Sequence, residues 1–452
     1  MRRSALPVLA LLLAALPLFA TAAEPARDTL PRRLVLALDG IPHEVFVAMQ
    51  ARGELAQFRP AGRMISTFPS LSDVAFAQIE GGAPPPGYQV TRYDPETNRI
   101  VGMDAGSLSE RAHPKIAADS ASHSVAHRLL GYVVPAALAR RDLRRVATQL
   151  LDSDKPTFVA YIGTSDAVLH LKGREGAEAY LRAVDDILAD LRKQVRIRTG
   201  RDLLVDLVSD HGSTMVESKV VPVEERLAGC GFNRRDGIEG RDDMAYSLPG
   251  LVASAAMYAH PERADDAARC LAGLEGVDLV AVARKDAVGV LAGDAEGEVR
   301  LVPGDVEQYA YRSVRGDPLG LLPAGAAPGA EQVFAQDQAL ALTMTAPRPD
   351  VLRRVWRAFH GEVVHPATLV VSLADGYEVG NSKLRMMTKL RGGHLGTHGS
   401  LTRNASTGVI ASTWREVADV NTAGANRLLY GPEVDAAVQR ALGTGSGTIS
   451  VR

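Results

Sequence analysis

The chain has no surplus of charge of either sign. Its 452 residues include 51 lysines and arginines against 53 aspartates and glutamates, and the formal net charge is −2. Nucleic-acid binding depends on many basic contacts to phosphates, and a polybasic membrane patch needs a run of like charges. The sequence offers neither feature, so neither kind of partner is indicated.

Cysteine is scarce as well, since Cys230 and Cys270 are the only two in the sequence. In an oxidising compartment these two could form a disulfide. The alternative is two free thiols in the core, because free cysteine is among the most buried residue types. The sequence leaves both alternatives open.

Long apolar runs are absent except at the N-terminus, which reads "MRRSALPVLALLLAALPLFATAAEPA". Two arginines, an apolar core and small residues before Ala22 or Ala23 are typical of a secretory signal peptide. The run is short and interrupted by prolines, which is unfavourable for a membrane span, and no cysteine follows it for lipid attachment. We therefore expect residues 1–23 to be removed and the mature protein to be exported, to the periplasm or outside the cell, without a membrane span.

What the sequence does contain is a set of apolar runs that each lead to an aspartate. "RRLVLALDG" leads to Asp39, "PTFVAYIGTSD" to Asp166 and "RDLLVDLVSDHG" to Asp210. Such runs are typical of buried parallel strands, and residues 175–199, between the last two, have helical spacing of apolar side chains. Strand, helix and strand in this order predict right-handed crossovers. We expect an α/β fold with a doubly wound, mostly parallel sheet.

The pattern changes in the middle of the chain, where residues 229–346 contain short strand-like runs separated by Gly, Asp and Glu turns. This pattern of short strands and turns predicts a smaller α+β insertion that forms a cap. The main domain would then consist of residues 24–228 and 347–452. A helical pattern across residues 348–361 and a strand-like run from Ala367 are expected to belong to the architecture of the main sheet.

The three aspartates all fall at the carboxyl ends of expected strands, where open α/β sheets bind their ligands. One acid in such a place is usually a helix cap or a turn former. Here histidines stand close to the acids or in a late glycine-rich loop: His170, His211, His394 and His398. Carboxylate and imidazole are good ligands for zinc and similar divalent ions, and such ions offset the cost of gathering acids in one place. The pattern therefore indicates a metal centre.

A candidate nucleophile lies in "MISTFPSLSDVAFAQIEGG", where a strand-like end is followed by a helical start. Ser72 is expected at the N-cap of this helix and Asp73 in its first turn. A hydroxyl at a helix N-terminus is well placed to attack phosphorus, because backbone N–H groups and the helix dipole favour the anion beside it. A plain helix cap is the alternative role for Ser72.

Six short motifs follow one another between Leu34 and Gly399: "LDG", "FPSLS", "RYDP", "SDAVLH", "SDHG" and "GTHG". In this order they resemble the alkaline phosphatase superfamily, and most closely its nucleotide pyrophosphatase/phosphodiesterase branch. The resemblance assigns the nucleophile to Ser72 through "FPSLS", with Thr67 as the alternative through "TFP". It assigns the metal ligands to six residues: Asp39, Asp166, His170, Asp210, His211 and His398.

This resemblance implies an exported two-metal hydrolase of phosphoric esters, similar to type I phosphodiesterases and nucleotide pyrophosphatases, which acts through a phosphoseryl intermediate. One ion would be held by Asp39, Asp210 and His211, and the other by the remaining three ligands. Zinc fits the mixed nitrogen and oxygen ligands best, with manganese or calcium as alternatives. The substrate would be a small-molecule phosphate ester, and the sequence leaves open whether it is a nucleotide, a phospholipid head group or a simple phosphomonoester.

Departures from the family pattern keep two alternatives open. Members of the branch carry an asparagine shortly before "YDP", whereas this chain has Val90, Thr91 and Arg92. A phosphomonoesterase of the same superfamily, or a non-catalytic cell-envelope relative that kept the fold, would also be consistent with this difference. The sulfatase branch is not indicated, because neither cysteine lies in the Cys-x-Pro-x-Arg type of motif. The sequence does not indicate an oligomeric state.

Overall fold

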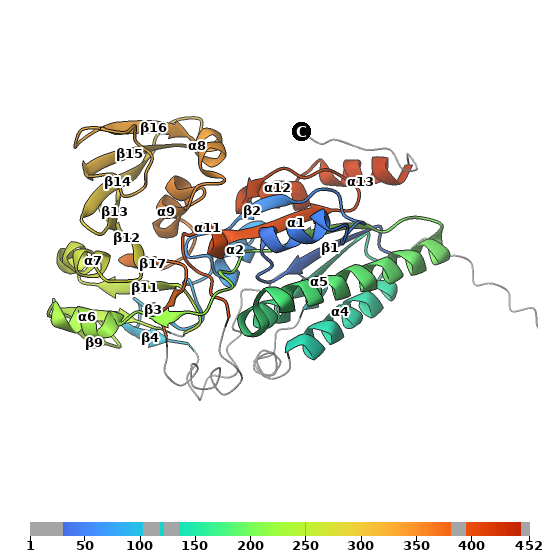
Figure 1. Cartoon of the computed structure of the whole chain (residues 1–452), viewed down its shortest axis with the longest axis horizontal. Coiled ribbons are helices and arrows are strands. Elements are labelled where there is room, and N and C mark those ends of the chain that lie inside the picture. Colours follow the sequence, from blue (N-terminus) through green and yellow to red (C-terminus); the bar gives the residue numbers. More distant parts are fainter. Residues whose placement is uncertain (1–29, 103–117, 122–134, 249, 381–394, 444–452) are drawn as a thin grey trace, which may run out of the picture.

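The computed structural model describes residues 30–102, 118–121, 135–248, 250–380 and 395–443. The expected signal peptide and His394 lie outside these ranges. Figure 1 shows two lobes side by side, each built on one sheet. Across the described ranges, no helix combines the length and the apolar character that crossing a bilayer requires.

One lobe is built on a seven-stranded sheet with the order β20-β2-β19-β7-β1-β6-β5. Its strands are β1 Arg33–Leu38, β2 Gly62–Ile65, β5 Ser120–Ala121, β6 Thr157–Ile162, β7 Leu204–Val208, β19 Thr407–Ser412 and β20 Val420–Asn421. β5, β6, β1 and β7 run parallel, as do β2 and β20, whereas β19 is antiparallel to both β7 and β2. The three strands expected from the sequence, β1, β6 and β7, are therefore neighbours in a mostly parallel sheet, which confirms the prediction.

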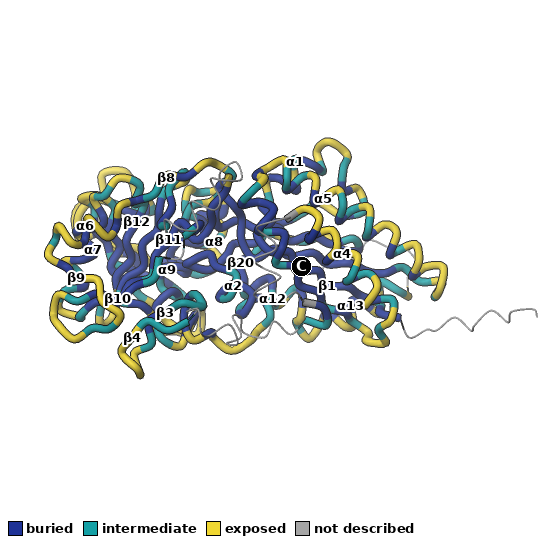
Figure 2. The backbone as a smooth tube through the Cα atoms, turned by 90° about the horizontal axis from the view of Figure 1, so that it is seen from below, coloured by how far each residue is buried: buried dark blue, intermediate teal, exposed yellow. Residues whose placement is uncertain are grey.

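Helices cover both faces of this sheet, because successive residues of a strand point to opposite sides. On one face the leucines of β1 pack with α1 His43–Ala51, α4 Pro135–Leu151 and α5 Thr164–Thr199. On the other face the alternate residues of β1 pack with α2 Ser72–Ile79 and α12 Thr422–Tyr430. Figure 2 shows the strands buried and the exposed residues on the outer sides of the helices. The sheet is doubly wound, as expected.

The other lobe is built on a nine-stranded sheet with the order β16-β15-β14-β13-β12-β17-β11-β10-β9. Its strands are β9 Asn233–Arg235, β10 Asp243–Tyr246, β11 Ser254–Ala259, β12 Val277–Ala283, β13 Val288–Ala292, β14 Ala295–Val302, β15 Gln308–Arg315, β16 Glu331–Ala335 and β17 Leu369–Leu373. All neighbours are antiparallel except β9 and β10. Its hydrophobic core includes residues of α6 Val223–Gly229, α7 Ala264–Ala272, α8 Gln336–Thr343 and α9 Val351–Phe359, and Val74 of α2 joins it from the first lobe.

The expectation that the strand after Ala367 belongs to the parallel sheet is wrong. This strand is β17, which lies inside the nine-stranded sheet and pairs antiparallel with β11 and β12. All of its residues are buried, and a continuous apolar run of this kind fits the middle of either sheet. α9, the helix expected within residues 348–361, also packs on β13, β14 and β15 of this lobe. The domain boundaries proposed from the sequence stay a prediction.

The remaining elements are short or lie at the edges. β3 Arg92–Asp94 pairs with β4 Arg99–Val101, and β8 Lys219–Val220 pairs with β18 Tyr377–Glu378. The short helix η1 Pro261–Arg263 leads from β11 into α7, and α11 Arg403–Ser406 directly precedes β19. α13 Val434–Gly443 is the last described helix and packs against Trp414 and Leu204.

A disulfide joins the two cysteines in the second lobe. Cys230 directly follows α6 and Cys270 lies in α7, and their sulfur atoms are 2.05 Å apart. Of the two alternatives that the sequence leaves open, the structure contains the disulfide.

Candidate metal centre

The candidate ligands lie where three parallel strands end side by side. Asp39 directly follows β1, Asp210 follows β7 after one residue, and Asp166 lies in the first turn of α5, which begins two residues after β6. β1 is in register with β6 and β7 up to these ends. Because the carboxyl ends of parallel strands meet at one edge of a sheet, the fold brings the three acids together.

All six expected ligands gather at this edge in two groups. In each group the atoms that could bind an ion lie within 4.8 Å of one another. The groups are Asp39, Asp210 and His211, and Asp166, His170 and His398. The rings of His211 and His398 are stacked with their centroids 3.8 Å apart, so the two groups adjoin.

The three histidines share one orientation. Each turns Nδ1 towards a backbone carbonyl: His170 to Gly396 at 2.6 Å, His211 to Gly212 at 2.8 Å and His398 to Ser70 at 2.9 Å. Each turns Nε2 towards one or two carboxylates. A metal-binding histidine commonly donates its other ring N–H in this manner, which fixes the ring and leaves the free nitrogen for the ion.

Asp39 is the most heavily contacted acid of the first group. Ser72 Oγ donates to its Oδ1 at 3.0 Å, and the Tyr161 hydroxyl donates to its Oδ2 at 2.6 Å. His211 Nε2 lies 3.3 Å from both Asp39 Oδ1 and Asp210 Oδ2. Gly40, in the "LDG" motif, has a φ of +74°, and a β-carbon there would lie 2.8 Å from Asp166 Oδ1. Only glycine leaves room for the carboxylate of the second group at this turn.

The spacing of the second group follows from the helix that carries it. Asp166 and His170 are one turn apart on α5, which places both side chains on one face, and His170 Nε2 lies 3.0 Å from Asp166 Oδ2. His398 reaches the same carboxylate from the late glycine-rich loop, with Nε2 3.9 Å from Asp166 Oδ1. α5 includes the helix expected at residues 175–199, with one non-helical residue at Gly173.

The electrostatics of the buried cluster fit divalent cations. Burial and the adjacent Asp39 raise the pKa of Asp210 to about 8. Burial opposes the charged form of His211, but Asp210 and Asp39 raise its pKa to about 10. Asp210 Oδ2 and Asp166 Oδ1, one oxygen in each group, are buried and accept no hydrogen bond from the described residues. Burying a carboxylate oxygen without a hydrogen bond costs free energy of folding unless a cation binds it. Three imidazoles with three carboxylates suit zinc-like ions.

Ser72 and Thr67 lie in different surroundings. Ser72 is the first residue of α2, and the N-cap position is occupied by Leu71, so the expectation that Ser72 is the N-cap is wrong by one residue. Its hydroxyl faces the first group, 3.0 Å from Asp39 Oδ1 and 3.3 Å from His211 Nε2. Thr67 is fully buried, and its hydroxyl donates to the Pro69 carbonyl at 2.8 Å. The geometry thus brings Ser72, and not Thr67, into contact with the candidate ligands.

Three residues around the site were not found from the sequence: Tyr161, Ser70 and Arg354. Tyr161 holds Asp39, Ser70 holds His398 through its carbonyl, and Arg354 contacts the Ser70 hydroxyl. Tyr161 lies near the carboxyl end of β6, where a hydroxyl beside a strand-end acid is a signal that could have been used. Ser70 acts through its own carbonyl and Arg354 mainly through carbonyls of other residues, and such contacts leave no pattern in the sequence.

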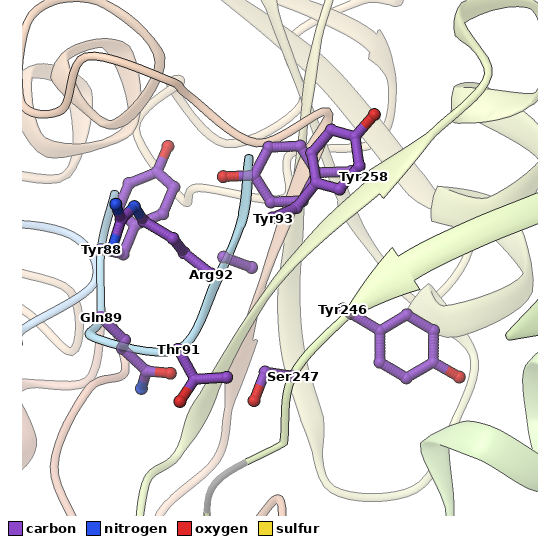
Figure 3. Close-up of a pocket in the computed structure, with 9 residues that line it drawn as sticks. Tyr88, Gln89, Thr91, Arg92, Tyr93, Tyr246, Ser247 and Tyr258 are labelled. Atoms are coloured by element: carbon purple, nitrogen blue, oxygen red, sulfur yellow. The ribbon is translucent and has the colours of Figure 1, made fainter. Parts of the chain in front are cut away.

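A pocket lies along β11, the strand that begins beside the loop of His398. Ser254 at the start of β11 faces Gly399, where a β-carbon would lie 2.7 Å from its Oγ, and Ala256 and Tyr258 on the same face of the strand line the pocket. Tyr93, Tyr246 and Arg92 complete much of its wall (Figure 3). Its volume of about 20 Å³ has room for about one water. It is therefore too small to hold the organic group of an ester.

Comparisons with known proteins find matches among solved structures. No protein-family model and no curated protein matches the chain. Phosphonoacetate hydrolase from Sinorhizobium meliloti 1021, solved in complex with phosphonoformate, is 15% identical with a TM-score of 0.50, and the match covers 91% of this chain and 96% of that one. Murine ectonucleotide pyrophosphatase/phosphodiesterase 5 is 12% identical with a TM-score of 0.45, covering 88% and 94%. At this identity the match to phosphonoacetate hydrolase shows a shared fold alone, which agrees with the mostly parallel α/β fold expected from the sequence.

Proposed function

We propose that the chain is a metal-dependent hydrolase of phosphoric esters that acts through a phosphoseryl intermediate, with Ser72 as the nucleophile. The observation that carries the proposal is the position of the Ser72 hydroxyl, 3.0 Å from Asp39 Oδ1 and 3.3 Å from His211 Nε2. A serine at the start of a helix most often caps that helix. The hydroxyl of Ser72 instead faces a set of candidate metal ligands. Both contacts of this hydroxyl are thus to candidate ligands of the first group.

In this proposal two divalent ions occupy the two groups of ligands. Asp39, Asp210 and His211 would hold one ion, and Asp166, His170 and His398 would hold the other. When bound, such a pair stabilises the attacking and the leaving oxygens of an in-line displacement at phosphorus. Zinc suits the mixed nitrogen and oxygen ligands best, with manganese and calcium as alternatives.

The residues of the chain supply attack and positioning. Ser72 Oγ loses its proton as it forms the new bond to phosphorus, and the ester bond breaks as the leaving oxygen takes the electron pair and gains a proton to become the alcohol. Water then hydrolyses the phosphoserine, which restores the serine hydroxyl and releases phosphate or a phosphomonoester. Backbone N–H groups at the start of α2 lie beside Ser72 and favour the negative phosphoryl group. Tyr161 keeps Asp39 oriented through its 2.6 Å hydrogen bond.

The proposed substrate is a diester of the kind hydrolysed by type I phosphodiesterases, with a phosphomonoester as the alternative. A comparison of bis-p-nitrophenyl phosphate with p-nitrophenyl phosphate, using protein stripped of metal and reloaded with zinc, manganese or calcium, tests both. We expect turnover to depend on the added metal and the diester to have the higher kcat/KM. A higher value for the monoester would select the alternative. Two bound ions without turnover of any ester would favour the non-catalytic relative.

We also propose that the protein is exported, in line with the N-terminal sequence. The disulfide between Cys230 and Cys270 supports an oxidising compartment. Mass spectrometry of protein from fractionated host cells should find a mature chain that lacks 22 or 23 residues, outside the cytoplasm. Full-length protein in the cytosol would contradict export without affecting the proposed chemistry.

A further inference from the structure

Arg354 is a fully buried arginine behind the candidate site. It lies on α9 and is 0% exposed, and its neighbours on that helix are largely apolar. None of its hydrogen bonds among the described residues goes to a carboxylate. Burial lowers the pKa of Arg354 to about 10, so the guanidinium stays protonated at neutral pH. A buried cation without a carboxylate on its N–H groups is costly unless many other acceptors satisfy it.

The acceptors are oxygens of the two loops that carry Ser72 and His398. Arg354 Nε and Nη2 donate to the Thr67 carbonyl at 3.2 and 3.0 Å, and Nη2 also lies 3.2 Å from Ser70 Oγ. In the second loop, Nη2 donates to the Ser400 carbonyl at 3.2 Å and Nη1 to the Leu401 carbonyl at 3.0 Å. The remaining contact, from Nη1 to the Pro349 carbonyl at 3.1 Å, ties the guanidinium to the start of its own helix.

Ser70 connects the same two loops directly. Its N–H donates to the Gly399 carbonyl at 3.1 Å, its hydroxyl to the Ser400 carbonyl at 2.7 Å, and its own carbonyl contacts His398 Nδ1 at 2.9 Å. Ser72 follows two residues later at the start of α2. The position of Ser70 therefore sets both the start of the nucleophile's helix and the orientation of the His398 ring.

We propose that Arg354 is a positioning residue that fixes the distance between Ser72 and His398. This inference rests on the proposed function, because it assigns Arg354 to the geometry of that same reaction. The guanidinium is planar and offers five N–H groups in a fixed arrangement, so one side chain satisfies both loops at once. A lysine has one nitrogen with three donors and cannot meet carbonyls on both sides. Arg354→Lys would keep the charge but leave buried carbonyls unpaired and the two loops free to shift.

The test compares Arg354→Lys with Arg33→Lys. Arg33 is a matched control, since it is also buried and bonds the Leu429 carbonyl and Asp206, but it lies at the start of β1, away from Asp39 at the other end. We expect Arg354→Lys to reduce kcat about 100-fold, the order of loss that follows a misplacement of about 1 Å, with KM changed by less than about threefold. Arg33→Lys should lower the melting temperature and leave kcat per folded molecule unchanged.

Zinc titration of the metal-free proteins gives a readout other than activity. In Arg354→Lys we expect one of the two zinc ions to bind about 10-fold to 100-fold more weakly, because His398 loses its fixed partner. The other ion should bind as in the unaltered protein. Arg33→Lys should bind both ions normally.

A second variant covers the case in which Arg354→Lys does not fold. Ser70→Ala removes only the hydroxyl that bonds Arg354 and Ser400, and we expect it to fold and to lose about 10-fold in kcat at an unchanged KM. Folded Arg354→Lys or Ser70→Ala protein with normal kcat and two normal zinc sites would overturn the inference. If Ser72→Ala is inactive at the same time, only the role of Arg354 fails; an active Ser72→Ala enzyme would instead remove the proposed function.

Discussion

Ser72→Ala is expected to lower turnover of a phosphate ester by several orders of magnitude while both metal ions stay bound. The substitution removes the attacking oxygen, whereas the six candidate ligands remain in place. Stability should change by no more than about 1 kcal/mol, because the substitution removes one hydroxyl with its hydrogen bond to Asp39 and leaves no large cavity. Steady-state kinetics, metal analysis and a melting curve of the same preparation check these three expectations.

Thr67→Ala is the matched control for the nucleophile. Thr67 bonds the Pro69 carbonyl and makes no hydrogen bond to the candidate ligands among the described residues, so its loss should cost about 1 kcal/mol of stability and little turnover. Acid quenching during turnover and mass spectrometry should locate phosphate on Ser72. A phosphopeptide labelled on Thr67, together with an active Ser72→Ala enzyme, would show that the assignment from "FPSLS" is wrong.

Asp210→Asn is expected to have opposite effects on metal binding and on the stability of the metal-free protein. The substitution keeps the shape of the side chain but removes a charged ligand, so zinc binding at that group and ester turnover should both be lost. In metal-free protein the carboxylate is costly, because burial and the neighbouring Asp39 raise the pKa of Asp210 from 3.8 to about 8. Asparagine does not carry this cost.

The sign of the stability change depends on pH and on metal. Unfolded chains ionise this carboxyl group near 3.8, whereas the folded metal-free protein does so only near 8, so the cost of Asp210 grows as the pH rises between these values. Each pKa unit corresponds to about 1.4 kcal/mol. In chelator, Asp210→Asn should therefore melt above the unaltered protein at pH 7 and close to it at pH 4. With zinc the order should reverse. A lower melting temperature in chelator at pH 7 would mean that Asp210 is structural.

The sequence determined the parallel sheet and the residues at its edge. β1, β6 and β7 are apolar at nearly every position because both faces of this sheet are buried, and such runs are readable without a structure. The acids that follow them are placed at one edge by the rule that parallel strands share their carboxyl ends. Local signals therefore sufficed to place Asp39, Asp166 and Asp210 at this edge of the sheet. The spacing of four residues on α5 sufficed to place His170 beside Asp166.

Tertiary structure alone decided which partners these elements take. β17 is as apolar as β1, and nothing local distinguishes the middle of an antiparallel sheet from the middle of a parallel one, so its pairing with β11 and β12 depends on the whole chain. The same holds for Arg354, which the sequence shows as one arginine in an amphipathic helix. Its role comes from carbonyls of Thr67, Ser400 and Leu401. Backbone carbonyls are common to all residues, so contacts made through them are fixed by packing and leave no mark in the sequence.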